Sequence, residues 1–298
     1  MKKLSRMPLL FSLIVVFILS GCSRFMGLRE PLYDGRPIER DDDAIAIYNE
    51  SGEIVGDEKE YYFRYPFSED IYQESSDYPE DDPVLLEEGE YIIGEDIPAG
   101  RATLLGNQSV FASENYEVHL GNLIIRDEAE NIYFENLFHA AYGQLVTQVD
   151  LIPGHTIEII GKDPEITVFY ASTIPEDPYI LMDPPQLLIN LDQLFVQQPL
   201  TTSEEDQSVV LTAGIYEVGV HIEPGTYEVA DFIAVHSTAM YLFHEGEEPR
   251  VFELVMDEDE IPVEELDQED NLTIQLQAGD KIYLELVSSL VLQRVDND

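Results

Sequence analysis

An internal repeat at a constant spacing of 125 residues is the feature that most restricts how this chain can fold. The repeated positions are Gly89, Tyr91, Gly94, Ile97 and Gly100 in the first segment and Gly214, Tyr216, Gly219, Ile222 and Gly225 in the second. The same spacing pairs His119 and Gly121 with His244 and Gly246, and Gly154 with Gly279. Matches over such a length indicate one unit present twice, in residues 84–171 and 209–298.

Each copy contains short apolar-rich runs that are predicted to be strands, separated by Gly, Pro and Asp. Examples are residues 157–160 and 166–170 in the first copy, and 239–243 and 281–287 in the second. Regularly spaced short strands are typical of an antiparallel sandwich or barrel. The predicted fold class is therefore all-β, with two tandem, homologous antiparallel β-sandwich or barrel-like domains. The turns at Gly154 and Gly279 are expected to join the last pair of strands of each copy as a hairpin.

A turn motif is the best-matched part of the repeat. Its structural residues are Gly94, Asp96, Pro98 and Gly100 in the first copy and Gly219, Pro224 and Gly225 in the second. Asp96 is expected to accept hydrogen bonds from nearby backbone amides, and the second copy has His221 in its place. The string resembles the Val-Gly-x-Asp-Ile-Pro-Ala-Gly-x-Tyr motif of small extracellular domains and lipoproteins of Gram-positive bacteria. That resemblance implies an extracellular β domain and carries no activity with it.

Residues 1–21 have the layout of a secretory signal peptide, in which basic residues precede an apolar stretch over residues 9–19. The stretch is shorter than the roughly 20 apolar residues that a membrane span needs. It ends in Leu19, Ser20, Gly21 and Cys22, which resemble the bacterial lipobox. This resemblance implies cleavage before Cys22, a diacylglycerol on its thiol, and anchoring at the extracytoplasmic face of the cell membrane. The alternative is an ordinary signal peptide followed by a chance cysteine.

Two further segments flank the copies. Residues 22–83, acidic and rich in Tyr, are predicted to be the lipid anchor and a spacer, with a short hairpin from strands at 44–48 and 60–65. The aromatic residues between 61 and 67 are expected to dock onto the first domain, and a ligand-binding patch is the alternative. Residues 172–208 are predicted to be a Pro-rich connector with one short helix.

The charge of the chain excludes one class of partner. Cleavage would leave twelve basic residues against 61 acidic ones, a formal charge of −49. Such a surface repels phosphate backbones, so nucleic-acid binding is excluded. Loose association with cations is expected, and specific calcium binding is the weaker alternative because no acidic run has the EF-hand spacing.

Motifs for catalysis are missing from the sequence. Cys22 is the only cysteine, and neither G-x-S-x-G nor H-E-x-x-H occurs. We therefore predict no catalytic residue, no metal site and no cofactor, and assign His119 and His244 structural roles at strand ends. The predicted function is a non-enzymatic binding or cell-envelope module with an envelope or extracellular ligand. The alternatives are a secreted enzyme, or an enzyme accessory, with a site between the domains, and a solute receptor.

Overall fold

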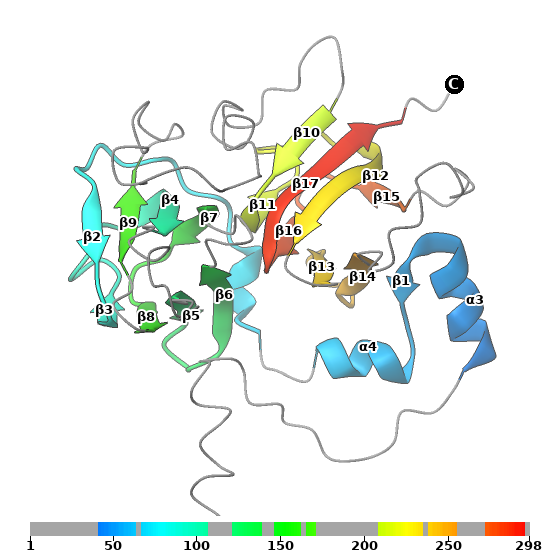
Figure 1. The fold of residues 1–298 in the computed structure, drawn as a ribbon, viewed down its shortest axis with the longest axis horizontal. Helices are drawn as coiled ribbons and strands as arrows, with labels where there is room; N and C mark the ends of the chain where they lie inside the picture. Colours follow the sequence, from blue (N-terminus) through cyan, green and yellow to red (C-terminus); the bar gives the residue numbers. More distant parts are fainter. Residues whose placement is uncertain are drawn as a thin grey trace, which may run out of the picture.

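A computed structural model describes residues 41–63, 67–106, 121–138, 146–161, 165–170, 208–234, 238–254 and 272–295. Strands dominate these residues, so the prediction of an all-β protein is confirmed (Figure 1). We name residues 41–83 the N-terminal segment, 84–170 the first half and 208–295 the second half. None of the helices in the described ranges is long and apolar enough to cross a bilayer.

The strands of the two halves follow one another in the same pattern. The first half contains β2 (Val84–Leu86), β3 (Gly89–Ile92), β4 (Gly100–Gly106), β5 (Gly121–Arg126), β6 (Ile132–Phe138), β7 (Val146–Leu151), β8 (Thr156–Gly161) and β9 (Ile166–Phe169). The second half contains β10 (Ser208–Leu211), β11 (Ala213–Glu217), β12 (Gly225–Ala234), β13 (Thr238–Phe243), β14 (Arg250–Leu254), β15 (Thr273–Leu276), β16 (Lys281–Leu284) and β17 (Val287–Arg294).

Strand order is the same in both halves. The orders β3-β8-β5-β6 and β7-β4-β9-β2 in the first half become β11-β16-β13-β14 and β15-β12-β17-β10 in the second. Every strand number rises by eight, which supports the duplication inferred from the repeat. One nine-stranded sheet nevertheless crosses both halves, because β7 pairs with β11 in parallel. Independent folding of the halves therefore stays a prediction.

A glycine makes this joint possible. Gly214 pairs with Gln148 across the β7–β11 junction at φ 150°. A Cβ atom at Gly214 would lie 2.1 Å from the Gln148 carbonyl oxygen, which no side chain tolerates. At the repeated position Gly89, a Cβ would meet only the Tyr91 side chain, at 3.7 Å.

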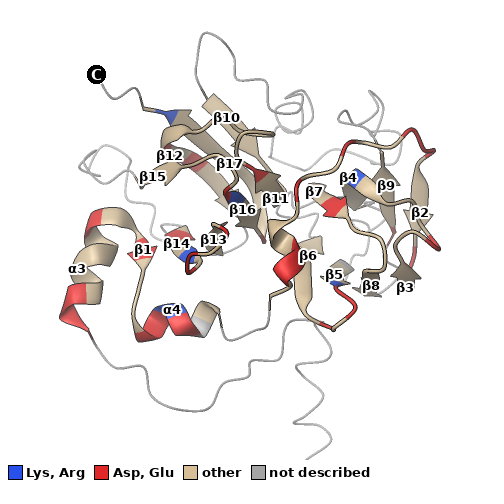
Figure 2. Ribbon diagram, turned by 180° about the vertical axis from the view of Figure 1, so that it is seen from behind, with Lys and Arg blue, Asp and Glu red and all other residues tan. Residues whose placement is uncertain are grey.

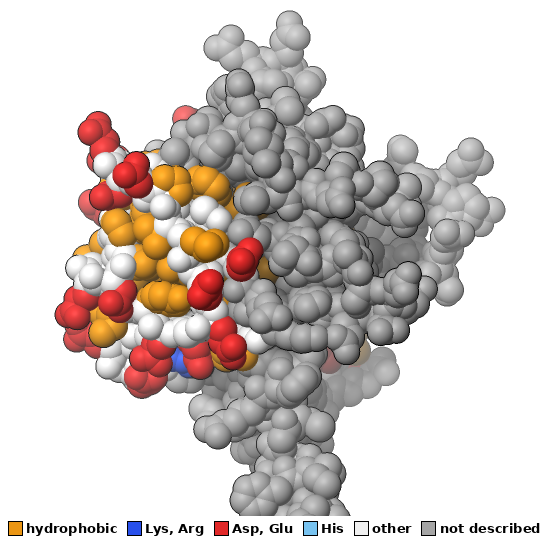
Figure 3. Space-filling view, turned by 60° about the vertical axis from the view of Figure 1, so that its left-hand side comes forward, with side chains coloured by type: hydrophobic (Ala, Val, Ile, Leu, Met, Phe, Trp, Pro, Cys, Tyr) orange, Lys and Arg blue, Asp and Glu red, His pale blue; other side chains and the backbone are white. Residues whose placement is uncertain are grey.

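The sheet β11-β16-β13-β14 is buried on both faces. Along β13, Met240 and Leu242 face the core of the second half, whereas Tyr241 and Phe243 belong to the core shared with the first half. Strands β2 and β3 of the first half carry exposed apolar side chains, with Leu85 at 51% and Ile92 at 39%. Apolar side chains lie among acidic ones on this side of the molecule (Figure 3).

The N-terminal segment covers the outer face of that doubly buried sheet. It consists of α3 (Asp42–Ser51), β1 (Glu53–Ile54), α4 (Asp57–Tyr62) and the 3-10 helix η1 (Glu69–Tyr72). β1 extends the sheet by pairing with β14. Arg250 binds both carboxylate oxygens of Glu53, at 3.0 and 2.6 Å. Acidic residues lie along α3 and α4 on the surface (Figure 2).

Two predictions for this segment are wrong. The helices α3 and α4 lie where the two strands of a hairpin were expected. Capping of α3 outweighs the strand-like alternation of Ile45 and Ile47. Asp41 caps α3 by accepting the Asp43 amide at 2.9 Å, and Gly52 ends it in the left-handed conformation. Residues 41–83 also form a packed layer instead of a spacer, since apolar side chains of this segment are buried in the core. The structure does not describe residues 1–40 or the connector up to 207.

Two predictions about turns are also wrong. Gly154 joins β7 to β8 and Gly279 joins β15 to β16, and in each case the two strands lie in different sheets instead of forming a hairpin. The matched glycines in the middle of the repeat are not equivalent either. Gly121 begins β5, whereas Gly246 lies in the turn that follows β13, the counterpart of β5. The chain between β4 and β5 is longer than the chain between β12 and β13, so the spacing of 125 residues does not hold for β5 and β13. His119 lies outside the described residues.

Candidate functional site

The predicted turn residues form corners at which the chain crosses between sheets. Gly94, Asp96, Pro98 and Gly100 connect β3 to β4. Asp96 Oδ2 accepts the Ile92 amide at 2.8 Å, the backbone-capping role that its position in the turn suggested. Gly219, Pro224 and Gly225 form the corresponding corner between β11 and β12. These residues organise the backbone, and none of them lines the pocket described below.

His221 takes over the role of Asp96 in the second half. Its Nδ1 accepts the Glu217 amide at 2.9 Å, so the imidazole is neutral in this bond. Burial, followed by the nearby charge of Arg101, lowers the pKa of His221 to about 3. The two corners therefore keep one hydrogen bond while using different side chains.

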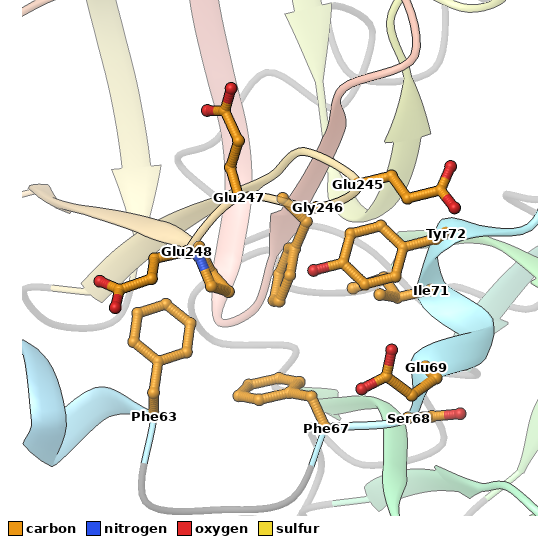
Figure 4. Close-up of a pocket in the computed structure, with 12 residues that line it drawn as sticks. Phe63, Phe67, Ser68, Glu69, Ile71, Tyr72, Glu245, Gly246, Glu247 and Glu248 are labelled. Carbon is orange, nitrogen blue, oxygen red and sulfur yellow. The ribbon is translucent and has the colours of Figure 1, made fainter.

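A concave site lies between the N-terminal segment and the turn joining β13 to β14 (Figure 4). It has a volume of about 690 Å³, which falls within the usual range for small-molecule sites. We name it the aromatic pocket. Its lining comprises Phe63, Phe67, Ser68, Glu69, Ile71 and Tyr72 from the N-terminal segment and Phe243, Glu245, Gly246, Glu247, Glu248 and Pro249 from the second half.

The part of the N-terminal segment that lines the pocket is anchored on both halves, and this positions the pocket walls. On the second half, Lys59 of α4 pairs with Glu248 at 3.2 Å. On the first half, the Ser68 amide donates to the Ile132 carbonyl at 2.8 Å, and Asp70 pairs with His155 at 2.8 Å. The aromatic residues between these anchors are therefore fixed above the sheet.

Aromatic side chains form the floor of the pocket around Phe243. The ring centre of Phe243 lies 5.5 Å from that of Phe67, 6.1 Å from Phe63 and 6.2 Å from Tyr72. These distances and the largely edge-on angles are typical of stabilising aromatic pairs. The sequence analysis expected this cluster to dock onto the first domain, but Phe63 and Phe67 pack mainly on Tyr241, Phe243 and Tyr283 of the second half.

Acidic side chains surround this floor. Four glutamates line the pocket, and within the described ranges exposed Glu248 forms an ion pair with Lys59. The Tyr72 hydroxyl and the Glu69 carboxylate point toward the cavity (Figure 4). Burial raises the pKa of Tyr72, and the charges of Glu69 and Glu245 raise it further. The pocket thus combines an apolar floor with a negative potential.

The junction of the two halves, where the enzymatic alternative placed a site, is filled by buried ionic side chains. Arg101 binds Asp150 at 2.9 Å and the Ile215 carbonyl at 2.8 Å. Lys281 binds Glu217 at 2.5 Å, which contributes to lowering the Glu217 pKa. Lys281 also donates to the Gln73 carbonyl at 2.5 Å, so these buried charges connect the two halves and the N-terminal segment. In the described part of the chain, no three His, Cys, Asp or Glu side chains gather in a geometry for a metal ion.

Sequence reasoning found part of this site. The aromatic residues between 61 and 67 were identified as a cluster, but the acidic turn from Glu245 to Glu248 was not. Its signal is three glutamates around Gly246, one residue after the continuous apolar run from Ala239 to Phe243. Leu19, Ser20, Gly21 and Cys22 lie outside the described residues.

Comparisons with known proteins leave the family open. No protein-family model and no curated protein matches the chain. Among solved structures, a variant of oxalate decarboxylase from Bacillus subtilis aligns at 11% identity with a TM-score of 0.15, covering 91% of this chain and 85% of that one. The same enzyme at pH 4.6 aligns at 12% identity with a TM-score of 0.16, covering 90% and 84%. Scores this low carry no argument about fold or function.

Proposed function

We propose that the chain is a non-enzymatic lipoprotein, anchored at the extracytoplasmic face of a membrane, which binds a small ligand in the aromatic pocket. The pocket is the observation that carries the binding role. It is concave, has an apolar floor and lies where two parts of the chain meet, as small-molecule sites commonly do. The anchoring role is supported by Leu19, Ser20, Gly21 and Cys22, and the extracellular setting by the turn motif around Gly94.

Anchoring is tested by Cys22→Ala in the full chain expressed in a bacterium. The variant should move from the membrane fraction to the soluble fraction, because no other anchor is proposed. Retention of the variant in the membrane at the level of the parent chain would contradict lipid attachment at Cys22.

Binding is tested by saturation-transfer NMR with a mixed set of cationic, anionic and neutral fragments. Binders should lose signal in Tyr72→Ala, which removes one pocket wall, and keep it in Tyr78→Ala, which changes a tyrosine that does not line the pocket. If no fragment binds in a Tyr72-dependent way, the binding role is wrong.

A further inference from the structure

We propose that the aromatic pocket selects organic cations, in particular quaternary ammonium compounds that carry an apolar body. The inference rests on the proposed function, since it names the ligand class of the same pocket. Its basis is the combination, in the lining of one cavity, of four aromatic rings with the inward-pointing Glu69 carboxylate and three further glutamates at the rim.

The rings provide the short-range part of this selectivity. Phe63, Phe67 and Tyr72 surround Phe243 within about 6 Å, centre to centre. The faces of such rings carry negative electrostatic potential and attract weakly hydrated cations within about 6 Å. An anion or a strongly hydrated ion gains nothing from these rings.

The glutamates provide the long-range part of the selectivity for cations. Glu69 lies on η1 and directs its carboxylate toward the cavity, whereas Glu245, Glu247 and Glu248 lie on the β13–β14 turn at the rim, with their carboxylates directed outward (Figure 4). Lys59 pairs with Glu248, whose side chain is 90% exposed, so solvent weakens this ion pair. A cation in the cavity is therefore favoured over a neutral molecule of the same shape.

The same geometry disfavours a bare metal ion. Calcium requires six to eight oxygen ligands at short distances, whereas the floor of this pocket is aromatic. Among the described residues, no acidic or histidine group gathers tightly enough to hold a metal. An organic cation needs no such shell of oxygens, because rings and diffuse negative charge are sufficient.

The test compares two probes that differ only in charge. Acetylcholine and 3,3-dimethylbutyl acetate have the same shape, with a nitrogen replaced by a carbon in the second. We expect the full chain, titrated by NMR at low ionic strength, to bind acetylcholine about tenfold more tightly or better. Equal binding of the two probes, or preference for the neutral one, would overturn the inference.

Variants locate the effect in the pocket. Glu69→Gln should weaken acetylcholine binding by about threefold or more and leave the neutral probe unchanged, because only the cation senses the lost charge. Phe67→Leu keeps an apolar side chain without a ring and should weaken the cation more than the neutral probe. The matched control Glu90→Gln changes an exposed carboxylate outside the pocket and should change neither. Equal binding by Glu69→Gln and the parent chain would contradict the assignment.

Two outcomes separate this inference from the binding role itself. If neutral or anionic fragments bind in a Tyr72-dependent way and acetylcholine does not, cation selection is wrong while the pocket remains a binding site. If calcium chloride at matched ionic strength displaces acetylcholine and itself binds with a dependence on Glu69, the site is a metal site and the inference fails.

Discussion

The sheet β3-β8-β5-β6 and its counterpart β11-β16-β13-β14 have the same strand order but different surroundings. Glu90 and Glu158 face each other across β3 and β8, and 125 residues later Ile215 and Tyr283 face each other across β11 and β16. Glu90 is exposed, whereas Tyr283 is fully buried under the N-terminal segment. The repeat thus preserves the strands, whereas this outer-face pair differs: it consists of two carboxylates in the first half, and of an apolar and an aromatic residue on the sheet that the N-terminal segment covers.

Removal of Tyr283 should show the largest difference between the halves. Tyr283→Ala deletes a fully buried ring that contacts Phe67, Phe134, Tyr241 and Phe243, and should lower the free energy of unfolding by about 3–5 kcal/mol. The counterpart change, Glu158→Ala, should alter it by about 1 kcal/mol or less. Urea unfolding measures both, and equal effects would show that the outer faces are equally buried.

The joint between the halves should depend on one of the two repeated glycines. Gly214→Ala brings a Cβ against the Gln148 carbonyl and should cost about 2 kcal/mol more than Gly89→Ala, where only a backbone penalty of about 1 kcal/mol applies. Hydrogen exchange at β7 should rise only in the first variant. If both variants lose the same stability, the parallel pairing of β7 and β11 is not important for the fold.

Acid should destabilise the second corner through His221. Because its pKa falls from an ordinary value near 6.5 to about 3 on folding, the unfolded chain binds more protons below pH 6.5. Stability contributed by the neutral imidazole is therefore lost as the pH falls from 6.5 toward 3. The slope due to His221 cannot exceed about 1.4 kcal/mol per pH unit, because one imidazole binds at most one proton.

His221→Asn keeps a hydrogen-bond acceptor that does not titrate. Between pH 6.5 and 5, where few carboxylates titrate, this variant should lose less stability than the parent chain in urea unfolding. Identical pH profiles would mean that His221 is not held neutral in the fold. Asp96→Asn provides the control in the first half.

The smallest effect concerns the two facing carboxylates of the open sheet. Like charges directly opposite on paired strands destabilise a sheet, so Glu158→Gln should raise the free energy of unfolding by about 0.2–1 kcal/mol at low salt. At about 1 M NaCl, where screening acts over about 3 Å, the gain should nearly vanish. A gain that is independent of salt would have to arise from something other than charge.

The aromatic pocket could be only partly predicted from the sequence. The aromatic residues before position 68 stand out as a cluster, but their partners Phe243 and Glu245 lie about 180 residues further along the chain. No periodicity links segments that distant. The local alternation at Ile45 and Ile47 also indicated strands, because nothing nearby shows whether those side chains will be buried; both are exposed on a capped helix.

The sequence by itself determined the all-β class, the duplicated strand pattern and the corner turns, because these depend on residues close together in the chain. Spacing of Gly, Pro and alternating apolar residues is sufficient for them. Only the tertiary structure decided that β7 joins β11, that His221 replaces Asp96 in the same hydrogen bond, and that the N-terminal segment covers one sheet. These features arise where buried surfaces meet, and which surfaces meet depends on the shape and charge of the whole fold.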